Sequence, residues 1–166
     1  GALAAQVSRV FGAAGVVVVD VCDAVLDVAY RMGADLAINP LREDPASAVA
    51  DLSVGRGAAA ILDTVGSPLS AYLPLLARGG RYVTMTVTDD PQEVATATLA
   101  GERSLTSSCN FHYSDYWEAL SMLENGTVDP DPIFTHRFSL AEAIEAFRVA
   151  EDKQATGAVK VLLISD

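Results

Sequence analysis

The side chains that most often bind metals or act as nucleophiles are few in this sequence. Cysteine and histidine occur only at Cys22, Cys109, His112 and His136. Metal sites are usually built from paired ligands at short, regular spacing, and no such pairing is present. The sequence therefore predicts no metal site. The wide separation of the two cysteines favours free, reduced thiols over a disulfide framework, as expected for a cytoplasmic protein.

Motifs of two common enzyme classes are also missing. No Gly-x-Ser-x-Gly turn presents a nucleophilic serine. No Gly-Lys-Ser or Gly-Lys-Thr loop is available to hold nucleotide phosphates. Acidic pairs occur at Asp89-Asp90 and Asp129-Pro130-Asp131, where we interpret them as solvated turns. These patterns assign no catalytic residue.

Composition limits the classes of partner. The 166 residues are 51% hydrophobic and 20% charged, which indicates a folded domain with a core. The formal net charge of −11 disfavours nucleic acid and anionic membrane surfaces. A small anionic nucleotide remains compatible, because backbone N–H groups can hold it locally. The longest aliphatic run, residues 16–19, is far too short to span a membrane, and no signal peptide is recognisable.

Hydrophobic periodicity alternates between helices and buried strands. We expect strands at residues 16–20, 36–38, 58–62, 81–87 and 104–108, separated by helices at 23–33, 46–52, 69–76 and 94–100. This alternation predicts an α/β fold with a Rossmann-like parallel sheet and helices on both faces. After Ser108 the pattern changes to a short α+β tail. We therefore divide the chain into a nucleotide-binding-type domain, residues 1–111, and a C-terminal segment, residues 112–166.

Ligands of open parallel sheets bind beyond the carboxyl ends of the strands. The residues that follow three successive predicted strands are thus candidates for lining a ligand: Thr64, Val65, Thr86, Val87, Cys109 and Asn110. The alternative, that each is an ordinary loop residue, stays open.

Several motifs in a fixed order carry a family resemblance. They are Arg31-Met32-Gly33-Ala34-Asp35, Ile38-Asn39-Pro40, Asp63-Thr64-Val65-Gly66, Arg78-Gly79-Gly80-Arg81, Asn125-Gly126-Thr127-Val128-Asp129 and Thr135-His136-Arg137-Phe138. In this order they resemble the zinc-type medium-chain dehydrogenases, and within them the sorbitol and threonine dehydrogenases. The resemblance covers essentially the whole chain and implies NAD as the cofactor.

The resemblance assigns two further residues to the cofactor. Gly1 stands where the family has the last glycine of its pyrophosphate-binding turn, directly before a helix. Asp20 ends the first strand 19 positions later, where a carboxylate accepts hydrogen bonds from the adenosine ribose and disfavours NADP. Asp20 could instead merely end a strand in water. Val25 departs from the arginine found in many relatives, which weakens the inherited site.

The resemblance also implies chemistry that this chain does not contain. The family activates its alcohol with a zinc ion whose ligands precede the nucleotide fold. We therefore expect part of an NAD-linked alcohol or polyol oxidoreductase, with no zinc and no activity in this chain alone. The alternative is a repurposed Rossmann-like protein that no longer binds NAD, either a binding or assembly module or a metal-free enzyme of unrelated chemistry.

The family's first, central strand and its glycine turn are not represented either. Loss of about four buried aliphatic side chains forfeits roughly 6–12 kcal/mol, comparable to the roughly 5–15 kcal/mol stability of a whole domain. We expect either a longer protein with an N-terminal domain or a homo-oligomer, such as a dimer. By resemblance, residues 104–108 are the place for a dimer contact. The first residue, Gly1, is not a methionine, which indicates cleavage, a residual tag or a cut from a longer protein.

Overall fold

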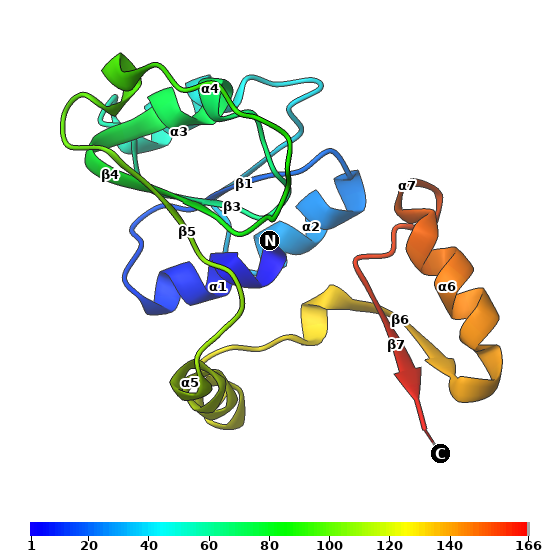
Figure 1. The fold of residues 1–166 in the computed structure, drawn as a ribbon. Coiled ribbons are helices and arrows are strands. Elements are labelled where there is room, and N and C mark those ends of the chain that lie inside the picture. Colours follow the sequence, from blue (N-terminus) through cyan, green and yellow to red (C-terminus); the bar gives the residue numbers. More distant parts are fainter. Residues whose placement is uncertain (166) are drawn as a thin grey trace. The chain divides into compact units, whose positions relative to one another are not determined.

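The computed structural model describes residues 1–165 and resolves into two compact units (Figure 1). The first unit consists of Gly1 and residues 44–116, and the second of residues 2–43 together with those from 117 onward. Each unit contains its own parallel strands and its own apolar core. The division at residue 111 that the sequence suggests stays a prediction.

The first unit is built on three parallel strands in the order β3-β4-β5. Its elements are α3 (Pro45–Ser53), β3 (Ala58–Asp63), α4 (Leu69–Tyr72), η1 (Leu73–Leu75), β4 (Leu76–Thr84), η2 (Thr96–Leu99) and β5 (Ser104–Ser107). In register, Asp63 lies beside Thr84, and Thr84 lies beside Ser107. The three strands therefore end at the same level, so the loops that follow them leave from one edge.

The core of the first unit lies between the sheet and the short helices. Leu73, Leu76 and Tyr82 are buried, and partly buried apolar side chains surround them. Burial of a large apolar side chain contributes about 1.5–3 kcal/mol. This core therefore holds β4, the central strand, in place, and with it the sheet edge from which the loops leave.

The second unit contains two pairs of parallel strands, β1-β2 and β6-β7. Its elements are α1 (Ala2–Val10), β1 (Val17–Val19), α2 (Asp23–Arg31), β2 (Leu36–Ile38), most of α5 (Tyr113–Glu124), η3 (Asp131–Ile133), β6 (Phe134–Ser139), η4 (Leu140–Glu142), α6 (Ala143–Glu151), α7 (Lys153–Thr156) and β7 (Lys160–Ile164). Helix α6 packs along the β6-β7 pair (Figure 1). A core around Val28 and Met32 joins α1 and α2 to η3.

The parallel α/β class predicted from the sequence is confirmed, with local differences. Residues 94–100 contain only a 3-10 turn, and β4 begins at Leu76, before the Gly79-Gly80 pair expected to precede it. The expectation that β3 is buried is wrong for most of its length, and Leu62 is 45% exposed. Within residues 1–165, β3 is hydrogen-bonded to β4 alone, so its other edge is open as well. In this described part of the chain, no helix is long and apolar enough to cross a membrane.

Candidate nucleotide-binding site

The first unit brings six of the predicted site residues to one edge of its sheet. Thr64 and Val65 follow β3, Thr86 and Val87 follow β4, and Cys109 and Asn110 follow β5. The parallel register keeps the three strand ends level, as the sequence pattern required.

The loop after β3 is folded around the carboxylate of Asp63. One oxygen, Oδ1, accepts hydrogen bonds from the backbone N–H groups of Val65 at 3.1 Å and Gly66 at 3.0 Å. The other, Oδ2, accepts from the N–H of Ser67 at 2.9 Å and from the hydroxyl of Tyr82 at 2.9 Å. Asp63 is only 4% exposed, and each of these donors reduces the cost of burying its charge. In the sequence, Asp63 is recognisable only as part of a motif, and no pattern marks Tyr82.

Two glycines lie beside the threonine hydroxyls of this edge. A side-chain carbon added at Gly1 would lie 3.4 Å from the hydroxyl oxygen of Thr64. One added at Gly66, whose φ is +85°, would lie 3.5 Å from the hydroxyl oxygen of Thr86. The Thr86 hydroxyl is also 3.1 Å from that of Thr84. The absence of side chains at both glycines leaves space beside the two threonine hydroxyls.

The edge combines hydroxyl groups with exposed aliphatic side chains. Val65 is 76% exposed and Val87 is 86% exposed, each next to a threonine. Apolar side chains can contact the flat face of an aromatic base, and hydroxyls can hydrogen-bond to ribose or phosphate oxygens. This arrangement suits a nucleotide better than a purely apolar ligand.

A small hollow follows the end of β5. It has a volume of about 330 Å³ and is lined by residues 107–112 and Asp115. Within it Asn110 adopts a left-handed conformation with φ of +63°, which asparagine tolerates better than most residues. The carboxylate of Asp115 accepts a hydrogen bond from the backbone N–H of His112 at 2.8 Å. Cys109 is a free, exposed thiol in this hollow.

Asp20 belongs to the second unit, where it directly follows β1. Its backbone N–H donates to the carbonyl of Ile38 at 3.1 Å, which fixes it to the end of β2. Its Oδ1 accepts a hydrogen bond from the backbone N–H of Cys22 at 2.9 Å. Within residues 1–165, its other carboxylate oxygen has no hydrogen-bond partner, so it can accept bonds from hydroxyl groups.

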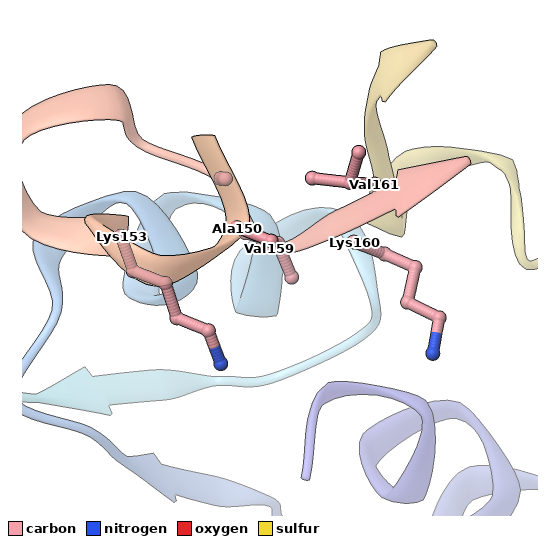
Figure 2. A pocket seen from close by; sticks show the side chains of 6 residues that line it. Ala150, Lys153, Val159, Lys160 and Val161 are labelled. Atoms are coloured by element: carbon pink, nitrogen blue, oxygen red, sulfur yellow. The ribbon is translucent and has the colours of Figure 1, made fainter. Parts of the chain in front are cut away.

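The second unit has a hollow of its own, remote in sequence from the predicted site. It measures about 260 Å³ and is lined by Ala150, Lys153, Ala158, Val159, Lys160 and Val161. The side chains of Lys153 and Lys160 both point away from Val161 (Figure 2). No residue of this hollow was singled out in the sequence. In the part of the chain that the structure describes, no three histidine, cysteine or acidic side chains are grouped as a metal would require.

Comparison with known proteins decides the family. The protein family described as zinc-binding dehydrogenase matches residues 1–125 of this chain. This chain belongs to that family. Residues 1–125 include both strand-end loops with threonines and the hollow after β5, so the candidate site lies within the matched part.

Individual relatives agree with the family assignment. The NAD-dependent alcohol dehydrogenase of Sulfurisphaera tokodaii is 32% identical over 95% of this chain and 46% of its own length. The L-threonine 3-dehydrogenase of Bacillus licheniformis is 30% identical over 99% of this chain and 48% of its own length. An Escherichia coli alcohol dehydrogenase solved with NADH superposes with a TM-score of 0.85 at 28% identity, over 98% of this chain and 50% of that one. The chain thus spans about half the length of these relatives.

The first unit of the chain fits the family's NAD cofactor in part. A side chain at Gly1 or Gly66 would occupy the space beside the Thr64 or Thr86 hydroxyl. The exposed Val65 and Val87 provide apolar contacts. The glycine turn that would surround a pyrophosphate is represented by Gly1 alone.

Proposed function

We propose that this chain is the coenzyme-binding part of an NAD-linked, zinc-dependent oxidoreductase of alcohols or polyols. The observation that carries the proposal is the level edge of β3, β4 and β5, where the loops after β3 and β4 each carry a threonine followed by an exposed valine. The similarity to an NAD-dependent alcohol dehydrogenase and to a dehydrogenase solved with NADH supports the choice of cofactor.

Each edge residue has a distinct proposed role. The hydroxyls of Thr64 and Thr86 hydrogen-bond to the nucleotide, and the side chains of Val65 and Val87 contact a ring and exclude water from it. Gly1, at the start of α1, gives a phosphate access to backbone N–H groups. Bound NAD supplies the hydride acceptor for alcohol oxidation. Cys109 and Asn110 extend the same edge from the end of β5.

Asp20 is the proposed determinant of cofactor choice. Its free carboxylate oxygen accepts hydrogen bonds from the two ribose hydroxyls of NAD. A 2′-phosphate at that position meets a negative charge, which costs binding free energy. We therefore expect NADH to bind more tightly than NADPH.

The oxidation step itself requires activation of the alcohol. In zinc-type dehydrogenases a zinc ion polarises the substrate oxygen, and the relatives are about twice as long as this chain. We propose that zinc binding belongs to that additional length, and that the 166-residue chain alone does not oxidise alcohols. Zinc-dependent reduction of NAD by this chain with an alcohol would contradict this assignment.

Titration with NADH, followed by its fluorescence, tests the proposed function. We expect saturable binding, and we expect Val87→Asp to weaken it by about tenfold or more because the new charge lies near a phosphate-bearing ligand. Val54→Asp is the matched control, since Val54 is 84% exposed in the same unit but follows α3, away from the edge. A parallel titration with NADPH tests the preference assigned to Asp20.

The repurposed alternative predicts a different result. The reduced glycine turn and Val25 are the sequence features in its favour. A chain that has lost coenzyme binding shows no saturable change in NADH fluorescence, and Val87→Asp then has no effect on the signal. That outcome would replace the proposed function with an assembly role or unrelated chemistry.

A further inference from the structure

Asp63 carries a buried charge at the end of β3. Its carboxylate is held by three consecutive backbone N–H groups, from Val65, Gly66 and Ser67, and by the Tyr82 hydroxyl. Hydrogen bonds to a charged acceptor are stronger and more directional than those between neutral groups. The conformation of residues 64–67 is therefore determined by where the Asp63 carboxylate lies.

Tyr82 fixes the position of that carboxylate. Its side chain is fully buried in the core formed with Leu73 and Leu76, on the central strand β4. Burial, followed by the hydrogen bond to Asp63, raises the pKa of the Tyr82 phenol above its ordinary value. The phenol thus remains a proton donor at neutral pH, and its rigid ring gives the hydroxyl one location.

The geometry links this pair to the candidate site. The turn that Asp63 organises carries Thr64, whose hydroxyl lies beside Gly1, and Gly66, which lies against Thr86. A shift of the turn moves the Thr64 hydroxyl and the exposed Val65 side chain relative to Thr86. Ligand contacts of this kind lose affinity when their supporting residues allow displacements of about 1 Å.

We propose that Asp63 and Tyr82 are positioning residues that hold the loop after β3 in its nucleotide-binding conformation. This inference rests on the proposed function, since it concerns the same edge of the sheet. Neither residue contacts the nucleotide. They act through the backbone of residues 65–67.

The test uses the whole chain and the variant Tyr82→Phe, which removes the hydroxyl and keeps the buried ring. We expect the dissociation constant for NADH to rise by about tenfold, the effect of losing one hydrogen bond to a charged group. Amide hydrogen exchange at Val65, Gly66 and Ser67 accelerates in the same variant. The amide of Ser108, which donates to the carbonyl of Thr84 at 2.9 Å, is the internal reference and keeps its exchange rate.

Leu73→Ala is the matched control for a loss of stability. It opens a cavity in the same core, so it lowers the melting temperature at least as much, but it leaves the Asp63 hydrogen bonds in place. NADH affinity of this variant, measured well below its melting temperature, stays within about twofold of the original, a change equivalent to much less than one hydrogen bond.

Each result has a distinct meaning. If the unaltered chain binds NADH and Tyr82→Phe binds it equally well, the positioning role is wrong and the proposed function stands. If Leu73→Ala weakens binding as much as Tyr82→Phe, the effect is one of stability and the positioning role is again wrong. If the unaltered chain shows no saturable binding, the proposed function fails and the inference fails with it.

Discussion

At the scale of single residues, Asp35, which directly precedes β2, is bound to the residue that directly precedes β1. Its Oδ2 accepts a hydrogen bond from the backbone N–H of Val16 at 2.7 Å and forms an ion pair with Arg9. The N–H of Val16 first, and then the Arg9 guanidinium, lower the pKa of Asp35 below its ordinary value. The charged form therefore stabilises the folded state at pH values above the unfolded pKa, and this stabilisation disappears as the pH falls through the lower folded pKa.

The Asp35→Asn substitution tests this contribution. At pH 7 we expect a loss of about 0.5–1 kcal/mol, because the pair is partly exposed and screened by solvent. Near pH 3 the difference from the unaltered chain becomes smaller. Thermal unfolding at the two pH values measures it, with Asp27→Asn, on helix α2 of the same unit, as the control. An equal difference at both pH values would contradict the argument.

Individual roles were only partly predictable from residue types. Threonines and valines after two strands could be identified because strand ends of parallel sheets face ligands. The role of Asp63 could not be predicted, because it depends on burial of the carboxylate and on a hydrogen bond from the hydroxyl of Tyr82, 19 positions further along the chain. Sequence spacing does not reveal that a tyrosine on one strand will reach the carboxylate that ends its neighbour.

At the scale of elements, the approach of β3 to β4 depends on glycine. Gly57 precedes β3 with φ of +86°, and a side-chain carbon there would lie 2.8 Å from both the backbone nitrogen of Ala77 and the carbonyl oxygen of Leu75. No real carbon tolerates such contacts with backbone atoms, so the strands would have to separate. This close approach explains how β4 can begin at Leu76, earlier than the hydrophobic pattern indicates.

Gly57→Ala and Gly55→Ala form a matched pair that isolates the steric effect. Both glycines have positive φ, but an added carbon at Gly55 meets nothing within 4 Å. We expect Gly55→Ala to cost about 1–2 kcal/mol from backbone strain alone, and Gly57→Ala about 1–3 kcal/mol more from overlap. Urea unfolding of the two variants measures the difference, and equal losses would show that the β3–β4 contact relaxes freely.

The element pattern was predictable wherever periodicity was strong. The three short strands β1, β2 and β5 lie within their predicted ranges, because runs such as residues 16–20 fit only a strand. The prediction of a helix at 94–100 was wrong, since only a 3-10 turn forms there. The start of β4 was also predicted wrongly, because a proline in η1 and two glycines in β4 interrupt the periodicity. Exposure of β3 could not be predicted, because a hydrophobic run does not show how many neighbours a strand has.

At the scale of the whole molecule, β1 and β3 are among the strands that keep an open edge. Within residues 1–165, β1 is hydrogen-bonded to β2 alone and β3 to β4 alone. Open edges next to exposed apolar side chains favour pairing with another chain. We therefore expect the 166-residue polypeptide, expressed by itself, to self-associate. Size-exclusion chromatography with light scattering measures this, and a stable monomer that melts cooperatively would contradict it.

The central claim is that the level ends of β3, β4 and β5 hold the nucleotide of NAD. The most direct measurement is a map of backbone amide chemical shifts during titration with NADH. We predict saturable changes at Thr64, Val65, Thr86 and Val87, with Val54 unaffected. An absence of saturable changes, or changes confined to the hollow around Lys153 and Lys160, would contradict it.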